Sequence, residues 1–324
     1  MYVFSRLCFP VDLLKIYIPQ EEGIRIAWQK AVMELSFAPG EGLCIQLLNA
    51  AANLGLDEIA IRIGARLGQL GISLQEFHFA AMLEATCKAG AFETSLKIVN
   101  MASESTSAKI LQKTLRPFIN ILDDLDKVDK AWALVETMHE KGKRVGIYTL
   151  NSLLQAAGQL GDLQRAIGIF SMFPKLGIRY TIESFNTLLT TCVGTQHKAL
   201  GMRLFSQLKE LGLQPDAKTF ERMINLMLTQ DEYEECFLYL EEMKASGFKP
   251  PQRVYMGIIK KCVYSKDERA SIAVAEMKEC GYVLTPAFER FIANGGARPN
   301  SREEWSLDFE TETPVDEKNA AFAE

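Results

Sequence analysis

The sequence predicts an all-α solenoid of about seven stacked helix-turn-helix repeats, each close to 35 residues long. Two periodic series of residues support this fold class. Six glycines stand 71, 35, 35, 35 and 34 residues apart, and a series of small residues recurs alongside them at intervals of 34 to 36. A period of this length is typical of repeats that bury their apolar faces only against their neighbours. The glycines are Gly71, Gly142, Gly177, Gly212, Gly247 and Gly281, and the small residues are Ala60, Ser95, Ala131, Ala166, Gly201, Cys236 and Ala270.

Each repeat is predicted to contain two helices, as residues 147–181 illustrate. Apolar residues at helical spacing between Leu150 and Ala157 are followed by an interruption at 158–162 and then by a second helical face. We expect the periodic glycine to end the second helix, because the residue after a helix often has a positive φ that glycine adopts without steric cost. We expect the small residues to be buried, since they allow neighbouring helices to approach closely.

The chain divides into three predicted segments. Residues 1–40 form an N-terminal segment with a capping helix at 24–37, residues 41–297 form the solenoid, and residues 298–324 form an acidic, disordered tail. Repeat 76–111 is one residue longer than most and lacks the periodic glycine, so we expect a loop or bend near its end. The predicted repeats are 41–75, 76–111, 112–146, 147–181, 182–216, 217–251 and 252–285, followed by a partial repeat at 286–297.

The charge distribution separates the tail from the rest of the chain. The formal net charge is −5, of which residues 301–324 contribute −6 through eight acidic and two basic side chains. Residues 1–300 therefore carry +1, without the strong positive field of a protein that coats nucleic acid. A narrow basic stripe is still compatible with this balance.

Chemical motifs are few in this sequence. The seven cysteines form no CxxC pair, and the three histidines have no partners at zinc-ligand spacing, so we expect no metal and no cofactor. We find no GxSxG, P-loop or HExxH motif, and we predict that the chain is not an enzyme. No run of 18 apolar residues is present, so membrane insertion is not expected.

Short motifs give the chain a family resemblance over roughly residues 41–285. The segments 149–154 (TLNSLL), 184–189 (SFNTLL) and 212–216 (GLQPD) resemble the pentatricopeptide repeat pattern. The tetratricopeptide repeat is less similar, because its tryptophan and Leu-Gly-Tyr signature is missing and the dominant spacing here is 35.

The resemblance implies a right-handed superhelix whose first helices line a groove for single-stranded RNA, with two side chains per repeat reading one base. Asn186 with Asp216 resembles a uridine-preferring pair, and Asn151 with Thr181 is a looser match that also indicates a pyrimidine. An asparagine early in a helix can instead satisfy backbone groups at the helix start. The candidates for phosphate contact are Lys88, Lys260 and Lys261, for which simple solvation is the alternative.

Taken with the resemblance, these features predict a non-catalytic, organellar RNA-binding protein that acts in RNA stability, processing or translation. The alternative is a helical scaffold or assembly factor that binds protein partners of the organellar gene expression machinery. The resemblance implies a mitochondrial location, with the plastid as the alternative. The first 19 residues are too poor in Arg and Ser to resemble a transit peptide convincingly.

Overall fold

The computed structural model describes residues 24–25, 28, 40–104 and 110–296, and every regular element in these residues is an α-helix. The chain forms two compact units, residues 1–195 and 196–324. Most of the predicted capping helix lies outside the described residues, and so do residues 105–109 and the whole predicted tail at 298–324. The fold class predicted from the sequence, an α-solenoid of paired helices, is confirmed.

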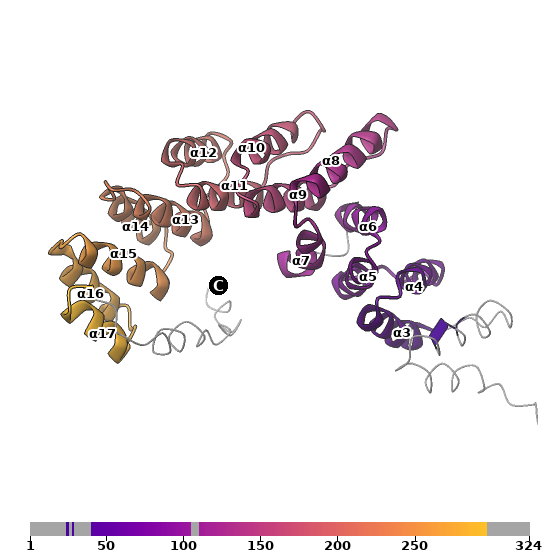
Figure 1. Cartoon of the computed structure of the whole chain (residues 1–324), viewed down its shortest axis with the longest axis horizontal. Helices are drawn as coiled ribbons and strands as arrows, with labels where there is room; N and C mark the ends of the chain where they lie inside the picture. Colours follow the sequence, from indigo (N-terminus) through magenta and orange to yellow (C-terminus); the bar gives the residue numbers. More distant parts are fainter. Residues whose placement is uncertain (1–23, 26–27, 29–39, 105–109, 297–324) are drawn as a thin grey trace, which may run out of the picture. The chain divides into compact units, whose positions relative to one another are not determined.

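In each unit, a first and a second helix alternate along the chain (Figure 1). Every first helix in the described residues begins where the sequence places the start of a repeat. The helices of unit 1 are α3 (Glu41–Leu54), α4 (Asp57–Gln69), α5 (Glu76–Lys88), α6 (Phe92–Glu104), α7 (Gln112–Ile121), α8 (Leu125–Glu140), α9 (Ile147–Gln159), α10 (Leu163–Met172) and α11 (Ile182–Gly194). Those of unit 2 are α12 (Lys198–Glu210), α13 (Ala217–Leu228), α14 (Glu235–Ala245), α15 (Gln252–Tyr264), α16 (Arg269–Glu279) and α17 (Pro286–Ala293).

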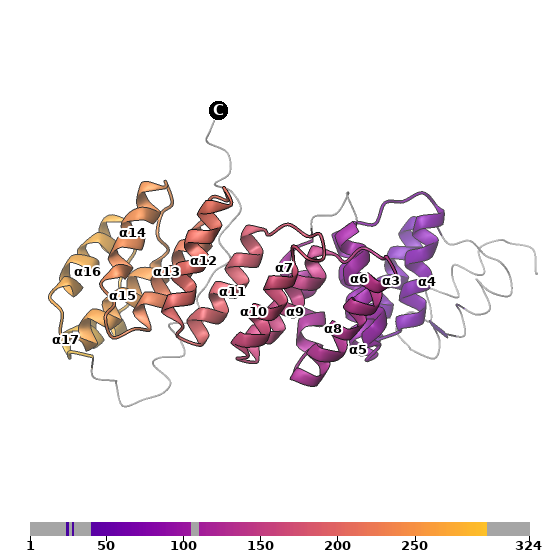
Figure 2. The same cartoon turned by 90° about the horizontal axis from the view of Figure 1, so that it is seen from above.

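The first helices form a continuous layer within each unit. In unit 1, α3, α5, α7, α9 and α11 pack in sequence against one another, and in unit 2, α13 packs against α15. The second helices α4, α6, α8 and α10 of unit 1 lie beside this layer, which Figure 2 shows from a second direction. Side chains on successive first helices can therefore face the same ligand.

The periodic glycines end the second helices as expected. All six have φ between 70° and 83°, in the left-handed region where a Cβ atom is unfavourable. Gly55, Gly90 and Gly161, which follow first helices, also have positive φ. Gln196 and Lys266 adopt φ of 57° and 53°, although neither is a glycine.

The periodic small residues are buried with one exception. Ala60, Ser95, Ala131, Ala166 and Cys236 have no exposed surface, and Gly201 is also buried. Ala270 is half-buried, so the expectation is wrong there. The reason is its place in the second residue of α16, the last paired second helix in the described chain, where no further second helix covers it.

Unit 1 departs from regular stacking where the sequence predicts a bend. Here α6 packs directly against α9, two first helices further along the chain, as well as against α7. Asn100 of α6 accepts a hydrogen bond of 2.6 Å from the Gly146 N–H and donates one of 2.9 Å to the Arg144 carbonyl. A Cβ on Gly146 would lie 2.1 Å from the Ser103 Cβ, so the contact requires glycine.

The interruption predicted at residues 158–162 begins later than expected. Gly158 is still helical, since α9 extends to Gln159, and the positive φ of 76° falls at Gly161. Gly158 instead allows close packing, because a Cβ there would lie 2.1 Å from Thr191 Oγ1 of α11.

Candidate nucleic-acid interface

Asn151 and Asn186 occupy the same position in neighbouring helices. Each is the fifth residue of its helix, in α9 and α11, which pack side by side in unit 1. Their exposed fractions are only 9% and 5%. The structure thus brings the two predicted base readers onto adjacent first helices, but it holds most of each side chain inside the layer.

The amide of Asn151 is oriented by the next repeat. Ser184 Oγ of α11 donates a hydrogen bond of 2.9 Å to Asn151 Oδ1, and the Thr181 N–H donates to Ser184 Oγ at 3.5 Å. Ser184 Oγ also lies 3.1 Å from Thr181 Oγ1, and with the serine proton directed at Asn151 the threonine hydroxyl is the donor of that pair. Across the described residues Asn151 makes no other side-chain hydrogen bond, so its Nδ2–H₂ group stays available as a donor.

Thr181 and Asp216 act as helix caps. Thr181 Oγ1 accepts from the Ser184 N–H at 3.3 Å at the start of α11, and Asp216 Oδ1 accepts from the Thr219 N–H at 2.7 Å at the start of α13. Both helices also have the reciprocal capping-box hydrogen bond. These contacts satisfy N–H groups that have no partner within the helix. Any role of either residue in reading a base stays a prediction.

Lys88 is placed to cap a helix end. Its Nζ donates to the carbonyls of Ala52 and Asn53 at 3.0 and 3.4 Å and pairs with Glu84 at 2.7 Å. The carbonyls belong to the last turn of α3, where a cation is favourable. All three ammonium hydrogens therefore have acceptors, and contact with a phosphate would have to displace one of them.

Lys260 and Lys261 are adjacent on α15 but contact different elements. Lys260 Nζ lies 5.7 Å from the Phe288 ring centroid of α17, whereas Lys261 Nζ lies 5.4 Å from the Tyr233 ring centroid ahead of α14. Neighbouring residues on a helix do not share a face. The two lysines therefore do not form one phosphate site.

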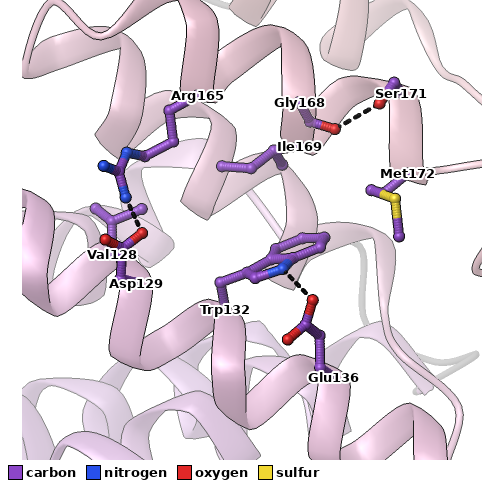
Figure 3. A pocket seen from close by; sticks show the side chains of 9 residues that line it. All are labelled: Val128, Asp129, Trp132, Glu136, Arg165, Gly168, Ile169, Ser171 and Met172. Atoms are coloured by element: carbon purple, nitrogen blue, oxygen red, sulfur yellow. Dashed lines mark hydrogen bonds and ion pairs between the residues drawn. The ribbon is translucent and has the colours of Figure 1, made fainter.

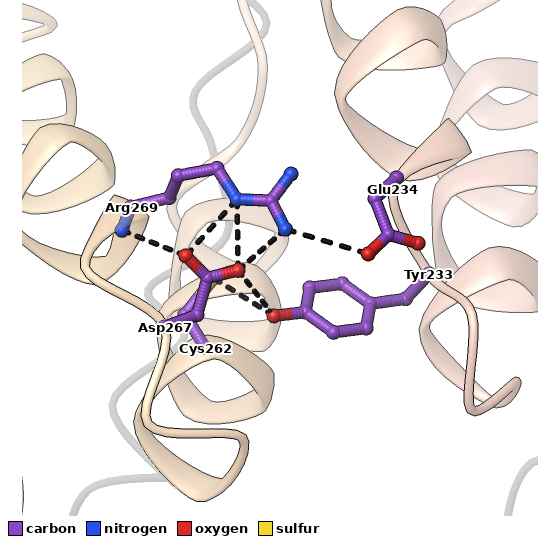
Figure 4. A network of polar contacts seen from close by, with 5 residues as sticks. All are labelled: Tyr233, Glu234, Cys262, Asp267 and Arg269. Carbon is purple, nitrogen blue, oxygen red and sulfur yellow. Dashed lines mark hydrogen bonds and ion pairs between the residues drawn. The ribbon is translucent and has the colours of Figure 1, made fainter.

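The surroundings of Tyr233 form a polar network that ties two turns of unit 2 together (Figure 4). Tyr233 Oη donates to Asp267 Oδ2 at 2.6 Å, and Arg269 pairs with Asp267 at 2.5 Å and with Glu234 at 3.6 Å. The Arg269 guanidinium and the Tyr233 hydroxyl hold the pKa of Asp267 well below its usual range. Arg269 thus bridges two carboxylates, and the network links the residues just before α14 to those just before α16.

The charge of the first helices differs between the units. Those of unit 1 hold three basic and four acidic residues, whereas those of unit 2 hold six basic residues against Glu221 and Glu289. Lysine and arginine on a helix layer attract phosphates. The basic residues of α13, α15 and α17 are Lys218, Arg222, Arg253, Lys260, Lys261 and Arg290.

A series of buried polar residues was not predicted from the sequence. The third residue of each first helix from α5 to α13 is polar and at most 6% exposed. Ser184, which positions Asn151, belongs to this series. Its signal was present in the sequence as a polar residue recurring every 35 or 36 positions. The members are His78, Thr114, Thr149, Ser184 and Thr219.

Within the described ranges, no group of three His, Cys, Asp or Glu side chains could hold a metal ion. No helix in the same ranges combines the length and apolar character needed to cross a bilayer.

Comparison with known proteins identifies the repeats. Family models described as "Pentatricopeptide repeat-containing protein" and "Pentacotripeptide-repeat region of PRORP" match residues 41–173 and 139–285. A mitochondrial pentatricopeptide repeat-containing protein of Arabidopsis thaliana is 24% identical over 228 residues, covering 68% of this chain and 38% of that protein.

Solved structures of the same family share the fold. The maize pentatricopeptide repeat protein PPR10, in complex with an 18-nucleotide psaJ RNA element, gives a TM-score of 0.53 at 16% identity, covering 96% of this chain and 46% of PPR10. This chain spans less than half the length of either protein. The two family models, which together extend over residues 41–285, agree with both relatives, and the chain belongs to the pentatricopeptide repeat family.

Proposed function

We propose that this chain is a non-catalytic protein of an organelle, the mitochondrion or alternatively the plastid, that binds single-stranded RNA and acts in RNA stability, processing or translation. The Arabidopsis relative named as mitochondrial and the RNA complex of PPR10 support this proposal. The observation that carries it is the pair of asparagines at equivalent positions of α9 and α11, with the Asn151 amide held by Ser184.

The Asn151 amide can donate to the pyrimidine that the family resemblance implies. With Oδ1 occupied by Ser184, the group offers Nδ2–H donors to a ligand. Uracil presents acceptors at O2 and O4, and cytosine presents them at O2 and N3, so either base can accept from Nδ2. A wrong base costs about 1–3 kcal/mol at a well-matched position. Two readers therefore contribute about 2–6 kcal/mol of discrimination, and phosphate contacts to the basic first helices of unit 2 add affinity without sequence preference.

Equilibrium binding to oligo(U), oligo(C) and oligo(A) at two salt concentrations tests the proposal. The double variant Asn151→Ala/Asn186→Ala should bind the pyrimidine strands about 5- to 150-fold more weakly, which corresponds to about 1–3 kcal/mol, with an unchanged salt slope. Lys260→Ala/Lys261→Ala should weaken binding to all strands alike and flatten the salt dependence.

Ser184→Ala tests whether the orientation of the Asn151 amide matters, separately from the presence of the amide. It keeps the Asn151 amide but removes the hydrogen bond that orients it, so the pyrimidine preference should fall while oligo(A) binding stays the same. The matched control is Thr187→Ala, which removes an exposed hydroxyl bonded only to the Glu183 carbonyl of its own helix. If the wild-type protein binds no strand at micromolar concentration and copurifies with a stoichiometric protein after nuclease treatment, the chain is a protein-binding scaffold instead.

A further inference from the structure

A pocket of about 340 Å³ lies between the second helices α8 and α10 of unit 1 (Figure 3). Its apolar wall consists of Val128, Trp132, Ile169 and Met172. No residue of the candidate nucleic-acid interface lines it. The mouth is open to solvent, since Glu136, Gly168 and Ser171 on its rim are exposed. An open groove of this kind suits a side chain presented by another protein.

The pocket carries one negative charge without a compensating cation. Arg165 is paired with Asp129 and, at 3.1 Å, with Asp162, so its charge is already neutralised. Glu136 Oε1 accepts a hydrogen bond of 2.6 Å from Trp132 Nε1. Within the described part of the chain, Glu136 forms no ion pair. An exposed carboxylate is thus held beside the edge of an indole ring, as the dashed line in Figure 3 shows.

Gly168 keeps the mouth of the pocket open. It is the sixth residue of the ten in α10, where glycine lowers helix stability relative to alanine. A Cβ atom added there would meet nothing within 4 Å, and Gly168 is not among the glycines with positive φ. Neither packing nor backbone conformation therefore requires glycine. Its missing side chain leaves open space at the rim of the pocket.

We propose that this pocket binds a lysine or arginine side chain of a partner protein, an activity separate from RNA binding. The aliphatic stem packs on Ile169 and Met172, the cationic head lies over the Trp132 ring, and Glu136 accepts its N–H groups. Cations are attracted to the face of an indole, and charge-assisted hydrogen bonds to a carboxylate are among the stronger ones. RNA is disfavoured here because the uncompensated carboxylate of Glu136 repels phosphates.

Peptide titration monitored by NMR tests this proposal. The probe is a blocked pentapeptide with one arginine between glycine and serine residues, and the control is the same peptide with citrulline, which keeps the shape but lacks the charge. A lysine version forms a third arm. The indole N–H signal of Trp132, assigned with Trp132→Phe, should shift with a Kd on the order of 1 mM for the cationic peptides. Citrulline should bind at least about tenfold more weakly.

Two variants remove the site without touching its packing. Gly168→Leu fills the mouth and should lose peptide binding at least about tenfold, while Gly168→Ala, the matched control, should bind as the wild type does. Gly168→Ala should melt no lower than the wild type, because its Cβ meets no neighbour, and the melting temperature of Gly168→Leu checks that this variant is folded. Glu136→Gln keeps an acceptor for the Trp132 N–H but removes the charge, and should also lose binding. All three should bind RNA as the wild type does.

Several outcomes would overturn the proposal. These are equal shifts with arginine and citrulline, wild-type peptide binding by Gly168→Leu, or no shift with any peptide at about ten times the expected Kd. Displacement of the arginine peptide by oligo(U) would assign the pocket to RNA. Since the asparagine variants of the first helices test RNA binding separately, failure here leaves the proposed function standing.

Discussion

Two glycines inside helices of unit 1 should respond to alanine in opposite directions. A Cβ on Gly158 of α9 would lie 2.1 Å from Thr191 Oγ1 and 3.2 Å from Thr191 Cβ, whereas a Cβ on Gly168 of α10 would meet no atom within 4 Å. Neither glycine has a positive φ. The comparison therefore isolates the contact between α9 and α11 from the intrinsic preference of glycine.

The expected magnitudes follow from two opposing effects. Replacing glycine with alanine inside a helix stabilises it by about 0.5–1 kcal/mol, so Gly168→Ala should raise the free energy of unfolding by that amount. For Gly158→Ala the same gain is opposed by overpacking, which costs about 1–3 kcal/mol. Rotating Thr191 relieves the contact with Oγ1 but not the one with Cβ. We expect a net loss of about 1–2 kcal/mol.

Urea denaturation of both single variants measures these changes, and Thr191→Ala completes a double-mutant cycle with Gly158→Ala. Because Thr191→Ala removes the clashing Oγ1, the second substitution should recover at least about 1 kcal/mol of the loss. If Gly158→Ala stabilises the protein as much as Gly168→Ala does, the close approach of α9 and α11 is wrong.

Three further predictions concern stability. Ala166→Leu should lower the free energy of unfolding by about 1–3 kcal/mol through overpacking, and an unchanged urea midpoint would contradict the burial of Ala166. Gln196→Gly should raise the free energy of unfolding by about 0.5–1 kcal/mol, as measured by thermal melting, because glycine adopts the φ of 57° without strain. Burial lowers the pKa of His78, whose Nδ1 accepts the Gln75 N–H at 3.0 Å. Its unfolded form binds the proton more readily, so stability should fall as the pH drops below about 6.5. Urea unfolding at about pH 7.5 and 5.5 should show a smaller fall for His78→Thr.

The hydrogen bonds that the predicted site residues make within the protein change how they can act. Asn151, Thr181 and Lys88 all have partners within the protein. Thr181 and Lys88 satisfy backbone groups, which was the alternative considered for asparagine, whereas Asn151 contacts a side chain of the next repeat. An RNA ligand would therefore meet a preoriented amide at Asn151, but would compete with the helix end at Lys88.

The sequence by itself determined the features that depend on residues adjacent in the chain and on the period of the repeat. The glycines that end second helices take positive φ because of their own backbone freedom, so Gly142 and Gly212 could be placed without knowing what surrounds them. The family resemblance and the all-helical class followed from the same local patterns. Burial of Ala166 was predictable because its period matches that of the repeat, and the expectation failed only at Ala270, where the paired helices end.

Only the tertiary structure decided the contacts that side chains make with other repeats. Ser184 reaches Asn151, Lys88 reaches Ala52, and Thr191 faces Gly158, each across 33 to 36 positions of the chain. Helical periodicity states which face of a helix is apolar, but it does not state which polar atoms on two packed helices come within hydrogen-bonding distance. That depends on how far one helix is displaced along its neighbour, and this displacement is set by the packing of the whole layer.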